Sequence, residues 1–133
     1  MASNLSTHPE QLSVARIMAT KGNCKKRNYG CAIFSPHGHL VSMGVTHANR
    51  ECKTCKRAKE KPGHGYDKCP SIHAEQHAIL NVIIPPGSIA YLACFDAVTR
   101  QEIIDPKPCP TCAKLLKEAG IREVVTISEV IKL

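Results

Sequence analysis

Residues 108–127 are PCPTCAKLLKEAGIREVVTI, a helical pattern that leads directly into an apolar run rich in β-branched residues. Pro110 lies in the first turn of the predicted helix 108–120, and Gly120 is placed to end it. The run that follows, 121–127, predicts a strand. Because helices that alternate with buried strands are typical of α/β proteins, we expect that fold class here.

The alternation of helices and strands continues toward the N-terminus. Apolar residues at helical spacing, after a capping-box pattern at Thr7 and Glu10, predict a first helix. Pro85-Pro86 stops a second one. The predicted elements are helix 8–21, strand 29–35, strand 40–47, helix 72–83, strand 88–95, helix 108–120 and strand 121–127. This order predicts one α/β domain, residues 1–133, with a mixed sheet covered on both faces.

Composition limits the possible partners. Hydrophobic residues make up 43% of the 133 residues, which is enough to build a core. The N-terminal sequence has no uninterrupted apolar segment of a secretory signal, and no run reaches the roughly 18 apolar residues of a membrane span. We therefore expect a cytoplasmic protein that does not enter a membrane. The formal charge of +7 indicates an anionic partner, a nucleotide phosphate or nucleic acid, although two Phe, three Tyr and no Trp offer few rings for base stacking.

The eight cysteines indicate metal binding or catalysis, because disulfides are rare in reducing compartments. Cys109 and Cys112 open a predicted helix, where backbone N–H groups and the helix dipole favour the thiolate form that binds metal. Two thiolates fill half of a tetrahedral zinc shell, and His73, at the start of another helix, can supply a third ligand. Water would take the open fourth position, and Glu75 can act as its proton shuttle.

These two motifs together match the signature of zinc deaminases, H-x-E followed by P-C-x-x-C. His73-Ala74-Glu75 supplies the first half, and residues 108–112, PCPTC, supply the second. Each half alone is a weak signal, but both open predicted helices and a buried strand lies between them. The competing interpretation is a structural CxxC pair with a His and a Glu on the surface.

The chain resembles the cytidine and deoxycytidylate deaminase superfamily from about Leu12 to Thr126. The resemblance is greatest to its deoxycytidylate deaminase branch, including phage members. It is carried by NYGCAIFSPHGHLVSMG (28–44), IHAEQHAIL (72–80) and KPCPTCAKLLKEAGIREVV (107–125). The resemblance implies a three-layer α/β/α fold.

The same resemblance implies a function. It implies hydrolytic deamination of a cytosine-type nucleotide, most closely dCMP to dUMP with release of ammonia. It also implies a catalytic Zn²⁺ held by His73, Cys109 and Cys112, with Glu75 as general acid/base. Members of the superfamily mostly form oligomers, so we also expect a homo-oligomer.

A second group of cysteines predicts another zinc site. Segment 48–71 has no periodicity, and a structureless stretch of this length is uncommon in a compact domain unless something organises it. Three of its cysteines and one after the first helix would form a structural zinc site, as in some phage members, and would make 48–71 a zinc-organised insertion loop. The predicted ligands are Cys24, Cys52, Cys55 and Cys69, with His64 or His47 as alternatives. Cys31 and Cys94 fall in apolar strands and are expected to be buried core thiols.

Substrate contacts are predicted from the basic residues and from the motif. A guanidinium can hold a phosphate with two hydrogen bonds, which favours Arg27 and Arg50 over the lysines of segment 48–71. The chain departs from the resembled branch at His77, where Asn is usual, and at GVTHANRE (44–51), which replaces a turn that contacts the sugar. The candidate contacts are Arg27, Thr46, Asn49, Arg50, Ala74 and His77.

Two other functions fit parts of the pattern. tRNA adenosine deaminases share the zinc motif and suit a basic chain, but they usually have Glu where this chain has Lys107. A non-catalytic, zinc-stabilised nucleic-acid-binding module would explain both CxxC pairs, but it gives Glu75 no role. We therefore expect a small-molecule nucleotide, rather than nucleic acid, as the partner.

Overall fold

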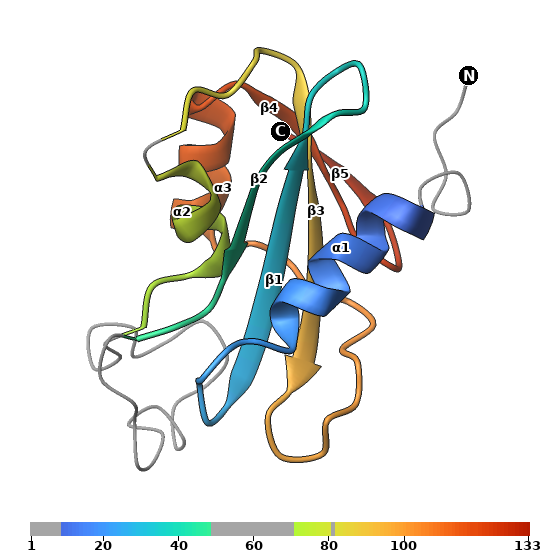
Figure 1. Cartoon of the computed structure of the whole chain (residues 1–133), viewed down its shortest axis with the longest axis vertical. Helices are drawn as coiled ribbons and strands as arrows, with labels where there is room; N and C mark the ends of the chain where they lie inside the picture. The colour runs from blue at the N-terminus through green and yellow to red at the C-terminus, as the bar shows by residue number, and fades with distance from the viewer. Residues whose placement is uncertain (1–8, 49–70, 81) are drawn as a thin grey trace.

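The computed structural model describes residues 9–48, 71–80 and 82–133. A mixed β-sheet forms its centre (Figure 1). Its strands are β1 (Arg27–Phe34), β2 (Leu40–Val45), β3 (Ser88–Asp96), β4 (Ile121–Val125) and β5 (Val130–Lys132), in the spatial order β2-β1-β3-β4-β5. β1 pairs antiparallel with β2 and β3, whereas β3 and β4 run parallel. β5 returns antiparallel to β4.

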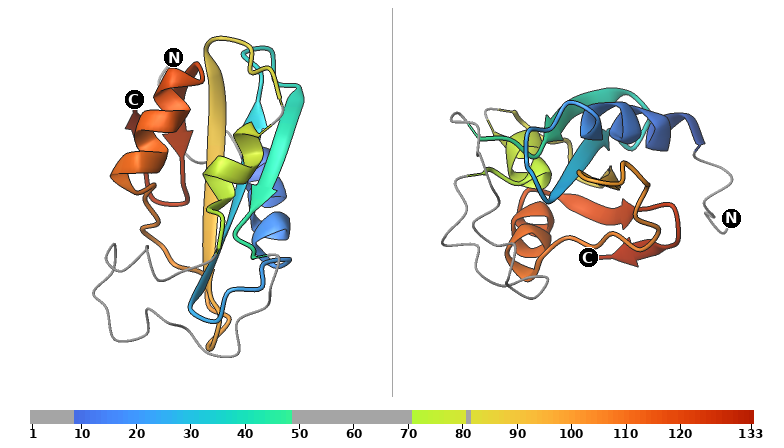
Figure 2. Two further views of the ribbon diagram at one scale, coloured as in Figure 1. Left: turned by 90° about the vertical axis from the view of Figure 1, so that its left-hand side faces the viewer. Right: turned by 90° about the horizontal axis from the view of Figure 1, so that it is seen from below.

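Helices cover both faces of this sheet within the described residues. α1 (Pro9–Ala19) lies on one face, and α2 (Ala74–Ile79) and α3 (Pro110–Glu118) lie together on the other (Figure 2). Successive residues of β1 alternate between the two sides, since side chains on a strand point to opposite faces. Ala32 packs with α1, and Cys31 packs with α2 and α3. The predicted α/β class and the mixed sheet covered on both faces are therefore confirmed.

Two glycines let the helices approach the sheet closely. A Cβ on Gly30 would overlap the backbone of α1 at Ala15, and a Cβ on Gly44 would overlap the backbone of α2 at Ala74. Backbone atoms of a packed helix cannot move aside as a flexible side chain can. The small residues on β1 and β2 thus determine how near each helix sits to the sheet.

The predicted helix 72–83 is wrong at both ends. α2 begins at Ala74 because Ile72 pairs with His47 in an isolated bridge. The helix ends at Ile79, and Leu80 is already extended with φ −70° and ψ 130°. Three β-branched residues, Val82, Ile83 and Ile84, disfavour helix beyond that point, and Pro85 restricts the residue before it to extended conformations.

The remaining elements follow the predicted order, with one addition. α1 begins at Pro9 and ends two residues before the predicted limit; its predicted capping residue, Thr7, lies outside the described residues. β5 was not predicted, because its three residues are too few to show a periodic pattern. Segment 49–70 also lies outside the described residues. No helix in the described ranges is long and apolar enough to cross a bilayer.

The connection from β3 to α3 is anchored on α1. Arg16 of α1 donates from Nε to both carboxylate oxygens of Glu102, at 3.0 and 3.2 Å. Pro106, further along the connection, is fully buried. These contacts fix the path of the chain just before it enters α3.

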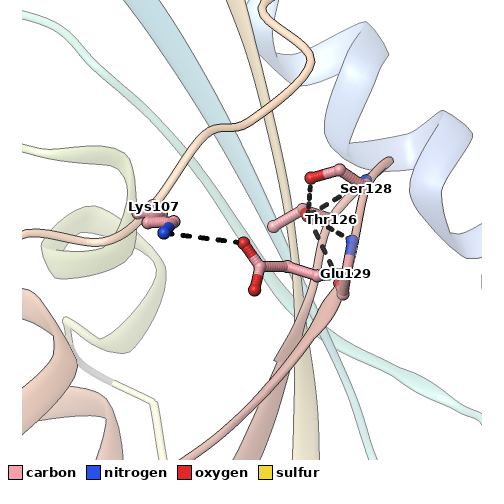
Figure 3. A network of polar contacts seen from close by, with 4 residues as sticks. All are labelled: Lys107, Thr126, Ser128 and Glu129. Carbon is pink, nitrogen blue, oxygen red and sulfur yellow. Dashed lines mark hydrogen bonds and ion pairs between the residues drawn. The ribbon is translucent and has the colours of Figure 1, made fainter.

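A second anchor lies at the turn between β4 and β5 (Figure 3). Thr126 Oγ1 accepts hydrogen bonds from the backbone N–H groups of Ser128 and Glu129, at 3.3 and 3.2 Å. The carboxylate of Glu129 then lies 3.9 Å from Lys107 Nζ. Because Lys107 stands two residues before Cys109, this contact is close to the start of α3.

Candidate active site

The first residues of α2 and α3 carry the predicted metal ligands. His73 is the N-cap of α2, in extended conformation with φ −71° and ψ 149°, and its backbone N–H donates to Gln76 Oε1 at 3.1 Å. Cys109 is the N-cap of α3, and its Sγ accepts from the backbone N–H of Cys112 at 3.4 Å. Both side chains therefore start at helix N-termini, where unpaired N–H groups favour negative charge.

The ligand atoms of these side chains converge. Those of His73, Cys109 and Cys112 all lie within 4.8 Å of one another. His73 Nδ1 is 3.2 Å from Cys112 Sγ and 3.7 Å from Cys109 Sγ. Ligands bound to one tetrahedral zinc ion are separated by about 3.5 Å, so the set fits this metal in spacing. It also fits in chemistry, because one imidazole and two thiols are donors that zinc prefers.

The two thiols of this group have unequal acidities. A hydrogen bond from the Cys112 side chain, together with contacts to His73, lowers the pKa of Cys109 to about 4. The same hydrogen bond and burial raise the pKa of Cys112. The contacts therefore favour the thiolate, the ligand form of cysteine, at Cys109 and the thiol at Cys112.

Glu75 is buried in the first turn of α2, with 4% of its surface exposed. Burial raises the pKa of its carboxyl to about 7, against opposing contributions from its own backbone N–H and from His73. The negative charge of Cys109 raises it further. A carboxyl poised near neutrality beside two candidate ligands can both take up and deliver a proton.

Alternate side chains of β1, such as Tyr29 and Cys31, face α2 and α3, and we call this side of the strand its inner face. The carboxyl of Glu75 contributes to raising the pKa values of Tyr29, Cys31 and Cys94, although burial is the main cause for each. Tyr29 packs against the core cluster that includes Ala74 of α2. Tyr29 is not among the predicted site residues. It stands two residues after Arg27 on β1, and this spacing indicates that the two side chains share one face.

The predicted substrate contacts are distributed over β1, β2 and α2. The Arg27 side chain, at the start of β1, hydrogen-bonds the hydroxyl of Tyr29. Thr46 is 7% exposed, and its Oγ1 accepts from the Tyr29 backbone N–H at 3.0 Å, so its hydroxyl is engaged with β1. Ala74 is fully buried. Asn49 and Arg50 lie outside the described residues.

His77 is held by the end of β2. Its Nδ1 accepts from the Val45 backbone N–H at 3.1 Å, which leaves Nε2 as the protonated nitrogen of the neutral ring. The rings of His77 and His47 lie 4.4 Å apart between centroids. Burial and the neighbouring His47 lower the pKa of His77. His77 is therefore a neutral, oriented side chain at neutral pH.

Of the second predicted set of ligands, Cys24 alone lies in the described part of the chain. Its Sγ accepts from the backbone N–H of Lys26 at 3.4 Å. Asn28 holds the Cys24 backbone through both its N–H and its carbonyl, at 2.9 and 3.1 Å. Cys52, Cys55, Cys69 and the alternative ligand His64 lie outside the described residues. The other alternative, His47, contacts the Val45 carbonyl oxygen through Nδ1 at 2.9 Å.

Comparison with known proteins places this geometry in a family. Residues 5–128 match the family model of the cytidine and deoxycytidylate deaminase zinc-binding region. Deoxycytidylate deaminase of Schizosaccharomyces pombe is 30% identical over 122 residues, and that of Saccharomyces cerevisiae is 28% identical over 120. Each match covers 86% of this chain but only 34% and 35% of the respective relative, so the chain spans about a third of their length.

The fold is also that of a solved cytidine deaminase. The enzyme from Burkholderia pseudomallei superposes with a TM-score of 0.61 at 16% identity, covering 94% of this chain and 91% of that one. The chain belongs to the cytidine and deoxycytidylate deaminase family.

Proposed function

We propose that the chain is a zinc-dependent hydrolase that converts dCMP to dUMP and ammonia. The observation that carries the proposal is the convergence of His73, Cys109 and Cys112 beside the buried carboxyl of Glu75. A purely structural zinc site is closed by four protein ligands and has no use for a buried carboxyl next to it. Relatives named deoxycytidylate deaminase support the choice of a cytosine nucleotide.

The convergence of these side chains supports a role for each residue. His73, Cys109 and Cys112 would hold the ion through one nitrogen and two sulfurs. Zn²⁺ bound there supplies Lewis acidity and a water that ionises near neutral pH. Glu75 would take a proton from the attacking water, pass it to the ring nitrogen N3, and deliver a second proton to the amine at C4. The C4–O bond forms, the C4–N bond breaks, ammonia leaves, and a uracil carbonyl remains.

The anionic character of the substrate matches the charge of the chain. The formal net charge is +7, and Arg27 lies on the inner face of β1, on the same side of the sheet as Glu75. A guanidinium in this position suits a phosphate group. We therefore propose a nucleoside monophosphate rather than a nucleoside or a free base as the substrate.

A substrate screen tests the proposal. Zinc-loaded protein is incubated with dCMP, deoxycytidine, cytosine and a cytidine- and adenosine-containing RNA, and ammonia release is measured. We expect release to be fastest from dCMP and to be absent with the Glu75→Gln variant. Ammonia from the RNA alone, or from none of the mononucleotides, would contradict the proposal and favour a nucleic-acid deaminase or a binding module.

We further propose a second, structural zinc held by Cys24, Cys52, Cys55 and Cys69. Two contacts support it. The side chain of Asn23, next to Cys24, brackets Ala48 through the Ala48 carbonyl and N–H at 2.9 and 3.0 Å. The bridge between His47 and Ile72 then brings the described residues on either side of segment 49–70 close to each other, and Asn23 holds Ala48 beside Cys24.

Metal analysis tests the two-zinc proposal. We expect two zinc ions per chain in the wild-type protein and one in each of two double variants, Cys52→Ala/Cys55→Ala and Cys109→Ala/Cys112→Ala. Only the second double variant should lose deaminase activity at a temperature where both remain folded. Wild-type stoichiometry of one, unchanged by Cys52→Ala/Cys55→Ala, would rule out the second site.

Self-association is a further part of the proposed function. Leu80 and Ile83, after α2, expose 52% and 94% of their surfaces. The two residues are three positions apart in the sequence, and large exposed apolar surface is typical of contact sites. We expect light scattering to show a homo-oligomer that the Ile83→Glu variant weakens; a monomer at all concentrations would contradict this.

A further inference from the structure

A partly buried tyrosine of β1, Tyr29, lies on the same face of the sheet as the predicted phosphate-binding arginine, Arg27. Arg27, Tyr29 and Cys31 occupy alternate positions of β1, so their side chains share the face of the sheet that α2 and α3 cover. Across the sheet, Tyr29 is the direct partner of Cys94 in β3, and Arg27 is the partner of Asp96. These residues form a row that leads from the core to the end of the sheet.

Hydrogen bonds join this row. The Arg27 side chain hydrogen-bonds the Tyr29 hydroxyl, and Tyr29 in turn hydrogen-bonds the thiol of Cys94. A guanidinium has only donors, so the phenol oxygen accepts from Arg27 and its own proton goes to Cys94 Sγ. Cys94 is fully buried, so its thiol gives the Tyr29 hydroxyl a partner whose position is fixed.

The row is aimed at the candidate active site. Tyr29 packs against the core cluster that contains Ala74, the residue between His73 and Glu75. Cys31 belongs to the same cluster, so the face of β1 that carries Tyr29 packs against the start of α2. Arg27 lies two residues before Tyr29 on the strand, about 7 Å away. That offset is suited to reach a group several bonds away from a base held near Glu75.

We propose that Tyr29 is a positioning residue for the substrate's phosphate, and that its hydroxyl, which contacts Cys94, holds the Arg27 guanidinium on the side of the sheet that carries Glu75. This inference rests on the proposed deaminase function and deepens it. Asp96, directly opposite Arg27 in β3, also attracts the guanidinium. The Tyr29 hydroxyl provides a competing contact from a ring that packs against the cluster containing Ala74.

The Tyr29→Phe variant isolates the hydroxyl, because it keeps the ring that packs against the core. We expect KM for dCMP to rise about tenfold, as for the loss of one hydrogen bond to a charged group, with kcat within about twofold of wild type. The corresponding constants for deoxycytidine, which has no phosphate, should not change. The matched control is Tyr91→Phe, which alters the buried tyrosine on the α1 face and should leave both substrates unaffected.

A double-mutant cycle tests whether Tyr29 acts through Arg27. Arg27→Ala should raise KM for dCMP at least as much as Tyr29→Phe, and the double variant should be no worse than Arg27→Ala alone. Additive effects on KM would overturn the inference. An equal rise in KM for dCMP and deoxycytidine would also overturn it, because the hydroxyl would then serve the base or sugar.

Equilibrium binding separates this inference from the proposed reaction. Calorimetry on the zinc-loaded Glu75→Gln protein compares dCMP with deoxycytidine, with and without Tyr29→Phe. We expect the phosphate to strengthen binding, and Tyr29→Phe to remove most of that gain, even if wild-type protein releases no ammonia. Equal affinities for the two ligands in the Glu75→Gln protein, or no binding of either, would overturn the inference.

Discussion

Two glutamates are buried in the part of the chain that the structure describes, and their surroundings differ. Glu123 of β4 is 2% exposed, and it is paired with Lys132 Nζ at 2.7 Å and with Arg122 Nε at 3.5 Å. Glu75 of α2 is 4% exposed, and burial raises its pKa to about 7. Burying a carboxylate is costly unless cations compensate its charge. At Glu123, Lys132 and Arg122 provide that compensation.

Glu75 has no such pair of cations in the described residues, and burial raises its pKa into the neutral range. The groups that affect the charge of Glu75 are His73 and Cys109, two of the three candidate zinc ligands. Perturbed carboxyls of this kind cluster at functional sites. Burial alone therefore does not identify a catalytic carboxyl. The neighbouring side chains distinguish a carboxyl that stabilises the fold from one suited to proton transfer.

The largest expected effect comes from replacing the Glu75 carboxyl with an amide, compared with the same replacement at Glu123. Glu75→Gln should lower kcat about 10³-fold, because an amide cannot accept or deliver the proton. Its free energy of unfolding should hold or increase, since a neutral amide is cheaper to bury than a carboxylate. Glu123→Gln is the matched control, with kcat unchanged and stability reduced by about 1 kcal/mol. Ammonia release and urea unfolding of both variants measure the contrast, and equal loss of activity in the two would remove it.

The same contrast extends to the two faces of the sheet. Leu12 of α1 and Leu116 of α3 are both buried, at 4% and 0% exposed. Truncating either to Ala should cost about 3 kcal/mol in the free energy of unfolding. Leu116 lies one helical turn after Cys112, so Leu116→Ala should also weaken zinc binding, measured by competition with a chelator. If Leu12→Ala weakened zinc binding as much, the metal centre would depend on overall stability rather than on α3.

A matched pair of glycines refines this test. Gly30→Ala would push on α1 and Gly44→Ala on α2, each through overlap with helix backbone. Overpacking of this kind costs about 2 kcal/mol in unfolding free energy, and both variants should show it. Gly44→Ala should in addition lower kcat, because α2 carries Glu75 and begins at His73. Unchanged kcat in folded Gly44→Ala protein would mean that the tip of α2 is positioned independently of its packing on β2.

Much of the architecture and the ligand group could be predicted from the sequence, for physical reasons. PCPTC marks a helix start, and HAE marks another, and thiol and imidazole groups at helix N-termini are a local pattern. The structure brings His73, Cys109 and Cys112 together as expected. Strands β1 and β3 have long apolar runs and were correspondingly clear.

Other features depend on contacts between distant residues. The true start of α2 is set by the bridge between His47 and Ile72, which no local pattern reveals. The position of Tyr29 opposite Cys94 depends on the register of β1 and β3. Thr46, predicted as a substrate contact, uses its hydroxyl on the Tyr29 backbone, and this pairing too requires the fold. Sequence patterns thus located the chemistry of the site better than they located the residues that position it.

The smallest expected effect compares two lysine ion pairs. Lys107 and Glu129 are 3.9 Å apart with 67% and 41% of their side chains exposed, whereas Lys132 lies 2.7 Å from a Glu123 side chain that is 2% exposed. Water screens the first pair, so Lys107→Ala should change the free energy of unfolding by less than about 0.5 kcal/mol. Among the described residues, Lys132→Ala leaves the buried carboxylate with Arg122 as its remaining ion-pair partner and should cost about 1 kcal/mol. Urea unfolding at low and high salt measures both; a larger loss for Lys107→Ala would show that the anchor beside Cys109 matters more than its exposure implies.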